Sequence, residues 1–200
     1  MLSKGDTTDA HGEAANARLL TIGHSTRSAE DFRALLEQHG VRRLVDVRRF
    51  PGSRRYPHFG AEALAESLGA IGIEYLHEPA LGGRRSAADG LSPNTYWRSA
   101  SFRAYADYMA TQEFRQALDR LVALAQEKLT AIMCSEAVPW RCHRQLIADA
   151  VVVRGLEVVD IIDAKHASPH RLNEHARIGP DEVLVYPANQ KELFQEEGRE

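Results

Sequence analysis

Cys134, Cys142 and His143 are the residues of this chain best suited to covalent or acid–base chemistry, and all three fall in the segment 130–153. A deprotonated thiol is a nucleophile, and an imidazole or a carboxylate can take up its proton. Glu136 supplies a carboxylate in the same segment, and Arg144 supplies a guanidinium that suits phosphate groups. We interpret these residues as a candidate catalytic and anion-binding site, with Cys142 as the nucleophile.

The elements expected around these residues explain why they would be reactive. Residues 130–134 form a short apolar run typical of a buried strand, and a helix is expected to begin near residues 141–144, with Cys142 in its first turn beside Arg141, His143 and Arg144. A helix N-terminus exposes unpaired N–H groups and a partial positive charge, which favour thiolates and anions. Cys142 should therefore have a lower pKa than Cys134, because burial at the end of a strand raises the pKa of a thiol.

Simpler interpretations of the same segment stay open. Cysteine is often a small core residue, so Cys142 can be a packing group, with His143 as a helix cap. A Cys-x5-Arg phosphatase signature is absent, since the sixth residue after Cys134 is Trp140 and the sixth after Cys142 is Ala148. The Cys-x7-Cys-His spacing is not a standard zinc pattern. We assign no metal ligand and no cofactor, and a metal-binding sensor remains an alternative.

Further polar residues follow two other apolar runs. His24 and Ser25 come directly after the first run of the chain, and Asp46 lies near the end of the second. His24 and Glu136 are candidate bases for Cys142, and Ser25 is a candidate ligand-binding residue. Asp46 is a candidate base or the buried partner of an arginine, because an interior carboxylate must be paired.

The segment 42–55 holds six arginines against one acid, although the net charge of the chain is −3. A local cluster of this kind can bind an anion on an otherwise neutral protein. Arg48, Arg49 and Arg54 suit bidentate phosphate contacts, and Tyr56 suits stacking against a base. The predicted partner is therefore an anionic small molecule or a nucleic acid.

Strands and helices alternate along the chain. We expect strands at 18–23, 41–47, 73–77, 130–134 and 157–162, a last short strand at 183–186, and a helix that starts at Ser168-Pro169. The order strand, helix, strand implies parallel neighbours, so we predict a single α/β domain. Its mostly parallel sheet would be flanked by helices in Rossmann-like layers. Ligands bind at the carboxyl ends of such strands, so the loops after the first four strands are expected at one edge.

Length and composition bound the organisation of the chain. Its 200 residues, 44% of them hydrophobic, fit one domain, which we place at 18–190 between a disordered tail at 1–17 and a charged tail at 191–200. The start lacks the apolar region of a secretory signal, and no run approaches the roughly 20 apolar residues that span a bilayer. We expect a cytoplasmic protein with two free cysteines and no membrane contact. The oligomeric state does not follow from the sequence.

Four segments in combination resemble the bacterial and archaeal family catalogued as domain of unknown function 488. They read TIGHSTRSAEDF, LVDVRRFPGSRRYPHF, IEYLHEPALGG and MCSEAVPWRCHRQLIA. The resemblance covers roughly residues 18–175, and the C-x-E-x-x-P-x-x-C-H-R run is its most specific part. It implies an α/β fold and a shared polar site, and it implies no particular activity.

These observations favour a strand-end pocket that binds a phosphorylated or nucleotide-like ligand and, if the protein is an enzyme, modifies it. A non-catalytic nucleic-acid-binding module that uses the arginine-rich segment 42–55 is the alternative from another class. The sequence does not decide between an enzyme and a binding protein.

Overall fold

The computed structural model describes residues 17–52, 54–86 and 90–188. The tails expected at 1–17 and 191–200 lie outside these residues except for Ala17, as do the last two positions of the expected domain. The strands are β1 (Arg18–Gly23), β2 (Arg43–Asp46), β3 (Glu74–His77), β4 (Thr130–Cys134), β5 (Glu157–Ile161), β6 (Ala167–Pro169), β7 (Arg177–Ile178) and β8 (Leu184–Val185). The α-helices are α1 (Ala29–Gln38), α2 (Ala61–Gly69), α3 (Ala100–Met109), α4 (Gln112–Glu127) and α5 (Arg144–Val153).

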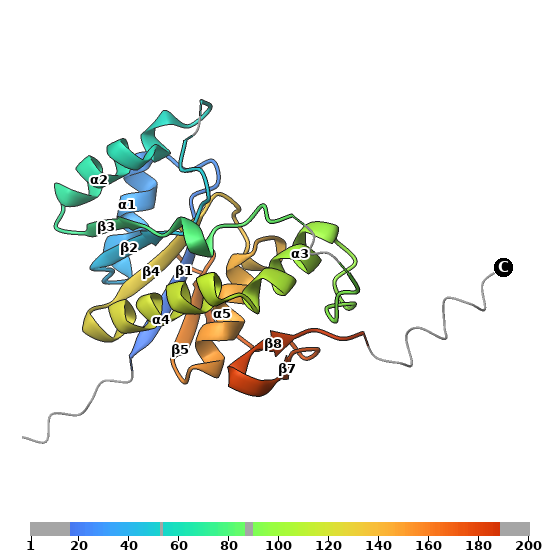
Figure 1. The fold of residues 1–200 in the computed structure, drawn as a ribbon. Coiled ribbons are helices and arrows are strands. Elements are labelled where there is room, and N and C mark those ends of the chain that lie inside the picture. The colour runs from blue at the N-terminus through green and yellow to red at the C-terminus, as the bar shows by residue number, and fades with distance from the viewer. Residues whose placement is uncertain (1–16, 53, 87–89, 189–200) are drawn as a thin grey trace, which may run out of the picture.

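Six strands form one sheet in the order β3-β2-β4-β1-β5-β6, and the first five strands in this order run parallel (Figure 1). The predicted α/β class and mostly parallel sheet are therefore confirmed. The prediction of a helix at Ser168-Pro169 is wrong, because these residues belong to β6, which pairs antiparallel with β5 at the edge. An edge strand tolerates proline, since half of its backbone groups need no partner in the sheet.

Helices cover both faces of the sheet. On one face, α1 and α2 contribute buried Phe32, Leu36, Leu64 and Leu68 to a cluster that also contains Ile22 of β1. On the other face, α3, α4 and α5 pack against the second large cluster. Among the described residues, no helix combines the length and the apolar composition needed to span a bilayer. The layers bury β2 and β4 completely and most of β1 and β5, whereas the edge strand β3 is only partly buried, and the strand ends are left free to carry a site.

A buried polar cluster connects the sheet to the C-terminal segment. His170 lies between two carboxylates, with Nδ1 2.8 Å from Asp160 Oδ2 and Nε2 3.0 Å from Asp149 Oδ1. Thr21 of β1 donates to Asp160, and Tyr186 donates to Asp149. Burial opposes a charge on His170, but the two aspartates outweigh burial and raise the pKa of His170 to about 9. The cluster ties β1, β5, α5 and the C-terminal segment together with short hydrogen bonds.

Candidate functional site

The carboxyl ends of the parallel strands meet at one edge, as predicted. In the strand register Gly23 of β1 lies beside Cys134 of β4, and Asp46 of β2 lies beside His77 of β3. The pairing continues past the strands, because the N–H of His24 donates to the carbonyl of Cys134 at 2.9 Å. The loops that carry the predicted site residues therefore converge in space.

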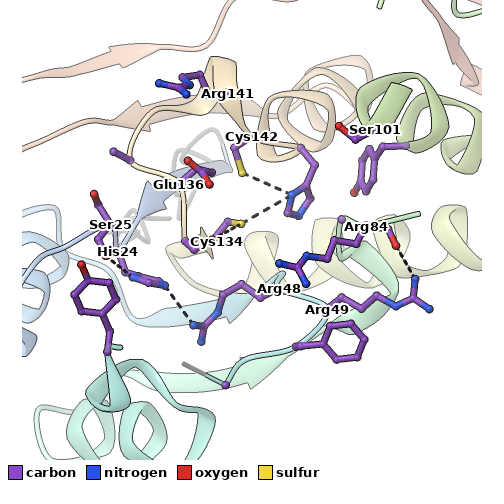
Figure 2. Close-up of a pocket in the computed structure, with 18 of the residues that line it drawn as sticks. His24, Ser25, Arg48, Arg49, Arg84, Ser101, Cys134, Glu136, Arg141 and Cys142 are labelled. Atoms are coloured by element: carbon purple, nitrogen blue, oxygen red, sulfur yellow. Dashed lines mark hydrogen bonds between the residues drawn. The ribbon is translucent and has the colours of Figure 1, made fainter. Parts of the chain in front are cut away.

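These loops surround a cavity of about 720 Å³ (Figure 2). Its lining comprises His24, Ser25, Thr26, Arg48, Arg49, Phe50, Gly52, Arg55, Tyr56, Gly83, Arg84, Ser101, Phe102, Tyr105, Cys134, Ser135, Glu136, Ala137, Arg141, Cys142 and His143. The residues come from the end of β4, from the loops that follow β1, β2, β3 and β4, and from the first six residues of α3. A cavity of this size accommodates a ligand of nucleotide dimensions.

Two thiols and one imidazole lie together in this cavity. His143 Nδ1 is 3.6 Å from Cys142 Sγ and 3.9 Å from Cys134 Sγ, and Figure 2 shows both sulfurs directed toward the same ring. His143 Nε2 is 3.0 Å from the carbonyl of Val47, which can only accept a hydrogen bond. Nε2 therefore carries the proton in the neutral ring, and the lone pair of Nδ1 faces the thiols.

The two thiols differ in acidity. The neighbouring Cys142 sulfur and burial raise the pKa of Cys134 to about 12. Burial also acts to raise the pKa of Cys142, but the Cys134 thiol and the Arg144 guanidinium outweigh it and lower this pKa to about 6. The order of the two pKa values is the one predicted from the sequence, and burial of Cys134 and the charge of Arg144 are among the expected causes, whereas Cys142 does not lie in the first turn of the helix.

The difference lies in where α5 begins. Pro139 starts a short 3-10 turn (Pro139–Arg141), Cys142 is extended, and α5 begins only at Arg144. The helix therefore begins at the last residue of the expected start, 141–144, and the prediction that Cys142 lies in its first turn is wrong. Cys142 precedes the helix, and a side-chain guanidinium rather than the first helical turn lies beside its sulfur.

Arg144 does not line the cavity, although the sequence led us to expect it to bind the ligand. Its side chain is fully buried, its Nη2 donates to the carbonyl of Glu136 at 2.6 Å, and its Nε lies 3.5 Å from Cys142 Sγ. A Cβ at Gly23 would lie 1.8 Å from the same carbonyl, so only glycine fits there. Arg144 therefore fixes the position of the Glu136 loop through a hydrogen bond and places a positive charge beside the thiol of Cys142.

Asp46 and Arg48 form a buried ion pair at the cavity wall. Asp46 accepts from Arg48 Nε at 2.9 Å, from its Nη2 at 2.5 Å and from the hydroxyl of Tyr75 at 2.9 Å. Arg48 Nη1 lies 3.3 Å from His24 Nε2, and His24 stacks on Phe59. Burial and the Arg48 charge lower the pKa of His24 to about 4, so its ring is neutral at physiological pH. Both nitrogens of His24 have partners, since Nδ1 lies 2.9 Å from the carbonyl of Ser25.

The arginines of the segment 42–55 do not form one patch. Arg42 and Arg43 lie at the amino end of β2, away from the cavity, and Arg43 forms ion pairs with Glu74 and Glu127. Arg54 is exposed and does not line the cavity, in contrast to Arg49, Arg55 and Tyr56.

Several lining residues were missed by the sequence reasoning. Arg84 follows β3 and accepts a hydrogen bond from Arg49 Nη1 through its carbonyl at 2.9 Å. Gly82 and Gly83, which precede Arg84, could have indicated that this loop approaches another backbone closely. A Cβ at Gly82 would lie 2.8 Å from the backbone of Arg49. Arg84 also has a left-handed backbone with φ of 59°, and so does Ser25, with φ of 50°. Strained backbone at non-glycine residues is frequent around functional sites.

The fold and the edge cavity define an α/β protein with a polar cavity at the carboxyl ends of its strands. A comparison with protein families matches residues 28–151 to the family described as domain of unknown function DUF488. The match covers more than half of the 200 residues, so the chain belongs to this family. It includes the cysteines, His143 and the lining arginines, whereas His24 and Ser25 precede it. Comparisons with curated proteins and with solved structures find no match.

Proposed function

We propose that the cavity binds a phosphorylated, nucleotide-like small molecule and that the thiols and imidazole of its wall act on this ligand. The observation that carries the proposal is the charge of the lining. Among the described residues, the lining holds five arginines, at positions 48, 49, 55, 84 and 141, and a single carboxylate, that of Glu136. Such a wall attracts anions, and guanidinium groups bind phosphate oxygens in a bidentate manner.

The charge available to a ligand comes mainly from the loops. Arg48 is neutralised by Asp46, so it shapes the wall more than it attracts an anion. Arg49, Arg84 and Arg141 form no salt bridge within the described part of the chain. Their guanidinium groups are the ones expected to hold phosphate.

Aromatic side chains of the lining are expected to bind the base of the ligand. Phe50 is 66% exposed beside Arg49, and Tyr56, Phe102 and Tyr105 also line the cavity. A base or another flat group can stack on such a face, with its phosphate held by the arginines. Glu136, the carboxylate of the wall, is the candidate acid–base group for a reaction of the bound ligand.

Calorimetric titration with a nucleoside monophosphate, the corresponding nucleoside and inorganic pyrophosphate tests the proposal. The double variant Arg49→Ala/Arg84→Ala should bind the two phosphate compounds at least about tenfold more weakly than the wild type, because hydrogen bonds to charged groups are lost. Arg42→Ala is the matched control, since Arg42 is exposed at the opposite end of β2. Binding that is equally tight for nucleoside and nucleotide, or equally affected by Arg42→Ala, would rule out a phosphate pocket.

A nucleic-acid ligand is the second candidate, and the exposed Phe50 next to Arg49 favours it. The same arginines and aromatic faces would then contact a single strand. Binding of a single-stranded oligonucleotide with a steep dependence on salt, together with no binding of the monophosphate, would replace the first candidate by this one.

A further inference from the structure

Cys134 Sγ, Cys142 Sγ and His143 Nδ1 all lie within 4.8 Å of one another, and together they have the dimensions of a metal site. Metal–sulfur bonds of about 2.3 Å and metal–nitrogen bonds of about 2.0 Å at tetrahedral angles place sulfur and nitrogen about 3.6 Å apart. The observed nitrogen–sulfur distances are 3.6 and 3.9 Å. A cation at the centre of the three atoms requires only small side-chain movements.

The surroundings of His143 prepare it to be a ligand. Its Nε2–H donates to the carbonyl of Val47, so the lone pair of Nδ1 is directed at the sulfurs. A hydrogen bond from the remote ring nitrogen to a backbone carbonyl is the usual support of a metal-bound histidine. Gly83 lies against the same ring, and a Cβ there would lie 3.0 Å from Nδ1. The absence of a side chain at position 83 keeps space beside the nitrogen.

The surroundings of Cys142 support a negatively charged sulfur. Arg144 Nε lies 3.5 Å from its Sγ, and Arg144 is fully buried, so its charge is poorly screened by solvent. Hydrogen bonds from N–H groups to a ligating sulfur stabilise the thiolate in metal centres. Arg144 therefore has the role of an outer support for the cation site.

We propose that Cys134, Cys142 and His143 bind one divalent cation of the zinc type. Two thiolates and an imidazole hold the cation in tetrahedral geometry, and any proton still carried by either thiol is released on binding. Thiolate and imidazole ligands select zinc over magnesium and calcium, which prefer oxygen. All three residues line the cavity, so the fourth position is open to it. Three protein ligands with an open position are typical of catalytic rather than structural zinc.

This inference deepens the proposed function, because a phosphate oxygen or a water molecule in the cavity can take the fourth position. The cation site itself does not depend on that ligand. The spacing of the three residues in the sequence does not predict the cation site. Cys134 ends β4, and the turn at Pro139–Arg141 brings Cys142 and His143 back to it. The two kinds of binding can therefore be measured separately.

The test is a titration of the reduced, chelator-treated full-length protein with cobalt, which reports thiolate ligation and tetrahedral geometry by its absorption spectrum. We expect saturation at one cobalt per chain, displacement by zinc, and an increase in the melting temperature of the wild type. Cys134→Ser, Cys142→Ser and His143→Gln should each weaken binding by at least about 100-fold, whereas His166→Gln, which changes an exposed histidine, should leave it unchanged.

The wild-type titration keeps the proposal falsifiable even if a variant fails to fold. Folded, reduced wild type that shows no thiolate-to-cobalt absorption and no zinc-dependent shift in melting temperature would overturn it. A cobalt spectrum that is unchanged in Cys134→Ser, Cys142→Ser and His143→Gln would also overturn the proposal. Disulfide formation between the two cysteines in wild type that binds no cation would identify a redox pair instead. Arg49→Ala/Arg84→Ala should bind cobalt like the wild type, so loss of phosphate binding alone leaves the cation site standing.

Discussion

His170 and His143 are imidazoles next to two acidic groups each, but the two regions are bonded very differently. His170 contacts Asp149 and Asp160 at 3.0 and 2.8 Å, and both carboxylates also accept from hydroxyl groups of other elements. His143 faces two thiols at 3.6 and 3.9 Å, with only its bond to the Val47 carbonyl short. The hydrogen bonds of the first region leave little capacity to bind another group. In the second region, the lone pair of His143 Nδ1 and the two sulfurs can still bind one.

This difference separates structural polar groups from candidate functional ones. Buried polar groups are normally paired, so a saturated cluster such as that of His170 is explained by stability alone. The cluster of His143 also lies over Arg144, whose Nη1 is buried without a hydrogen-bond partner among the described residues. The lone pair of His143 Nδ1 and the two sulfurs are acceptors with spare capacity, and a cation provides an explanation for them, whereas the unpaired N–H of Arg144 is a donor that a cation does not satisfy.

Breaking the saturated cluster should have the largest effect on stability. Asp149→Ala removes one carboxylate from His170 and the acceptor of the Tyr186 hydroxyl, and it leaves both groups buried. Removing one partner of a buried ion pair typically costs 3–5 kcal/mol, so we expect the free energy of unfolding to fall by about 4 kcal/mol. Urea denaturation measures this change.

Asp119→Ala is the control for that experiment, because Asp119 pairs with Arg154 on the surface, with its side chain 58% exposed. Surface pairs contribute about 0–1 kcal/mol, so this variant should unfold almost like the wild type. Equal losses in the two variants would show that the burial of the His170 cluster has no special importance.

The pH dependence of the same cluster should have a somewhat smaller effect. The pKa of His170 is raised to about 9 in the folded protein from 6.5, so its contribution to stability is complete below pH 6.5. It is then lost as the pH rises through 9, and a change of this size corresponds to about 3 kcal/mol.

Other groups titrate in the same range, so the measurement is the difference between the wild type and His170→Gln in free energy of unfolding. This difference should shrink steadily between pH 6.5 and 9 and stay constant below pH 6. His24 does not interfere, because its lowered pKa of about 4 acts only below pH 6.5. A constant difference from pH 6 to 9 would show that His170 is not charged in the folded protein.

The sequence predicted the arrangement of the strands better than the state of the side chains. The alternation of strands and helices was sufficient to bring Cys134, His24 and Asp46 to one edge, because parallel strands end on the same side. The segment 42–55 shows what local patterns cannot decide. Arg48 is buried against Asp46 while Arg54, six residues later, is exposed, and nothing in the residue types distinguishes them.

Contacts of loops with the elements beside them account for the other differences. Arg144 is held by the carbonyl of Glu136 and the sulfur of Cys142, which lie in the loop that precedes it and fold back over its guanidinium. The partners of His170 come from α5 and β5, and Arg84 reaches the cavity from the loop after β3. Such contacts depend on tertiary packing rather than on periodicity, so they became visible only with the fold.

The smallest effect on stability is expected at the open cluster. Cys134 is buried, as Asp149 is, but its sulfur lies 3.9 Å from both Ser135 Oγ and His143 Nδ1, and its other polar neighbour is the Cys142 thiol. Cys134→Ala in metal-free protein should therefore lower the free energy of unfolding by about 1 kcal/mol, the loss expected from packing alone. Addition of zinc should increase the difference in free energy of unfolding between the wild type and Cys134→Ala, because only the wild type is stabilised by tight zinc binding in the folded state. Urea denaturation with chelator and with excess zinc gives both values. A loss near 4 kcal/mol with chelator would show that the Cys134 thiol stabilises the fold as Asp149 does. If zinc leaves the difference between the wild type and Cys134→Ala unchanged, Cys134 does not bind the cation.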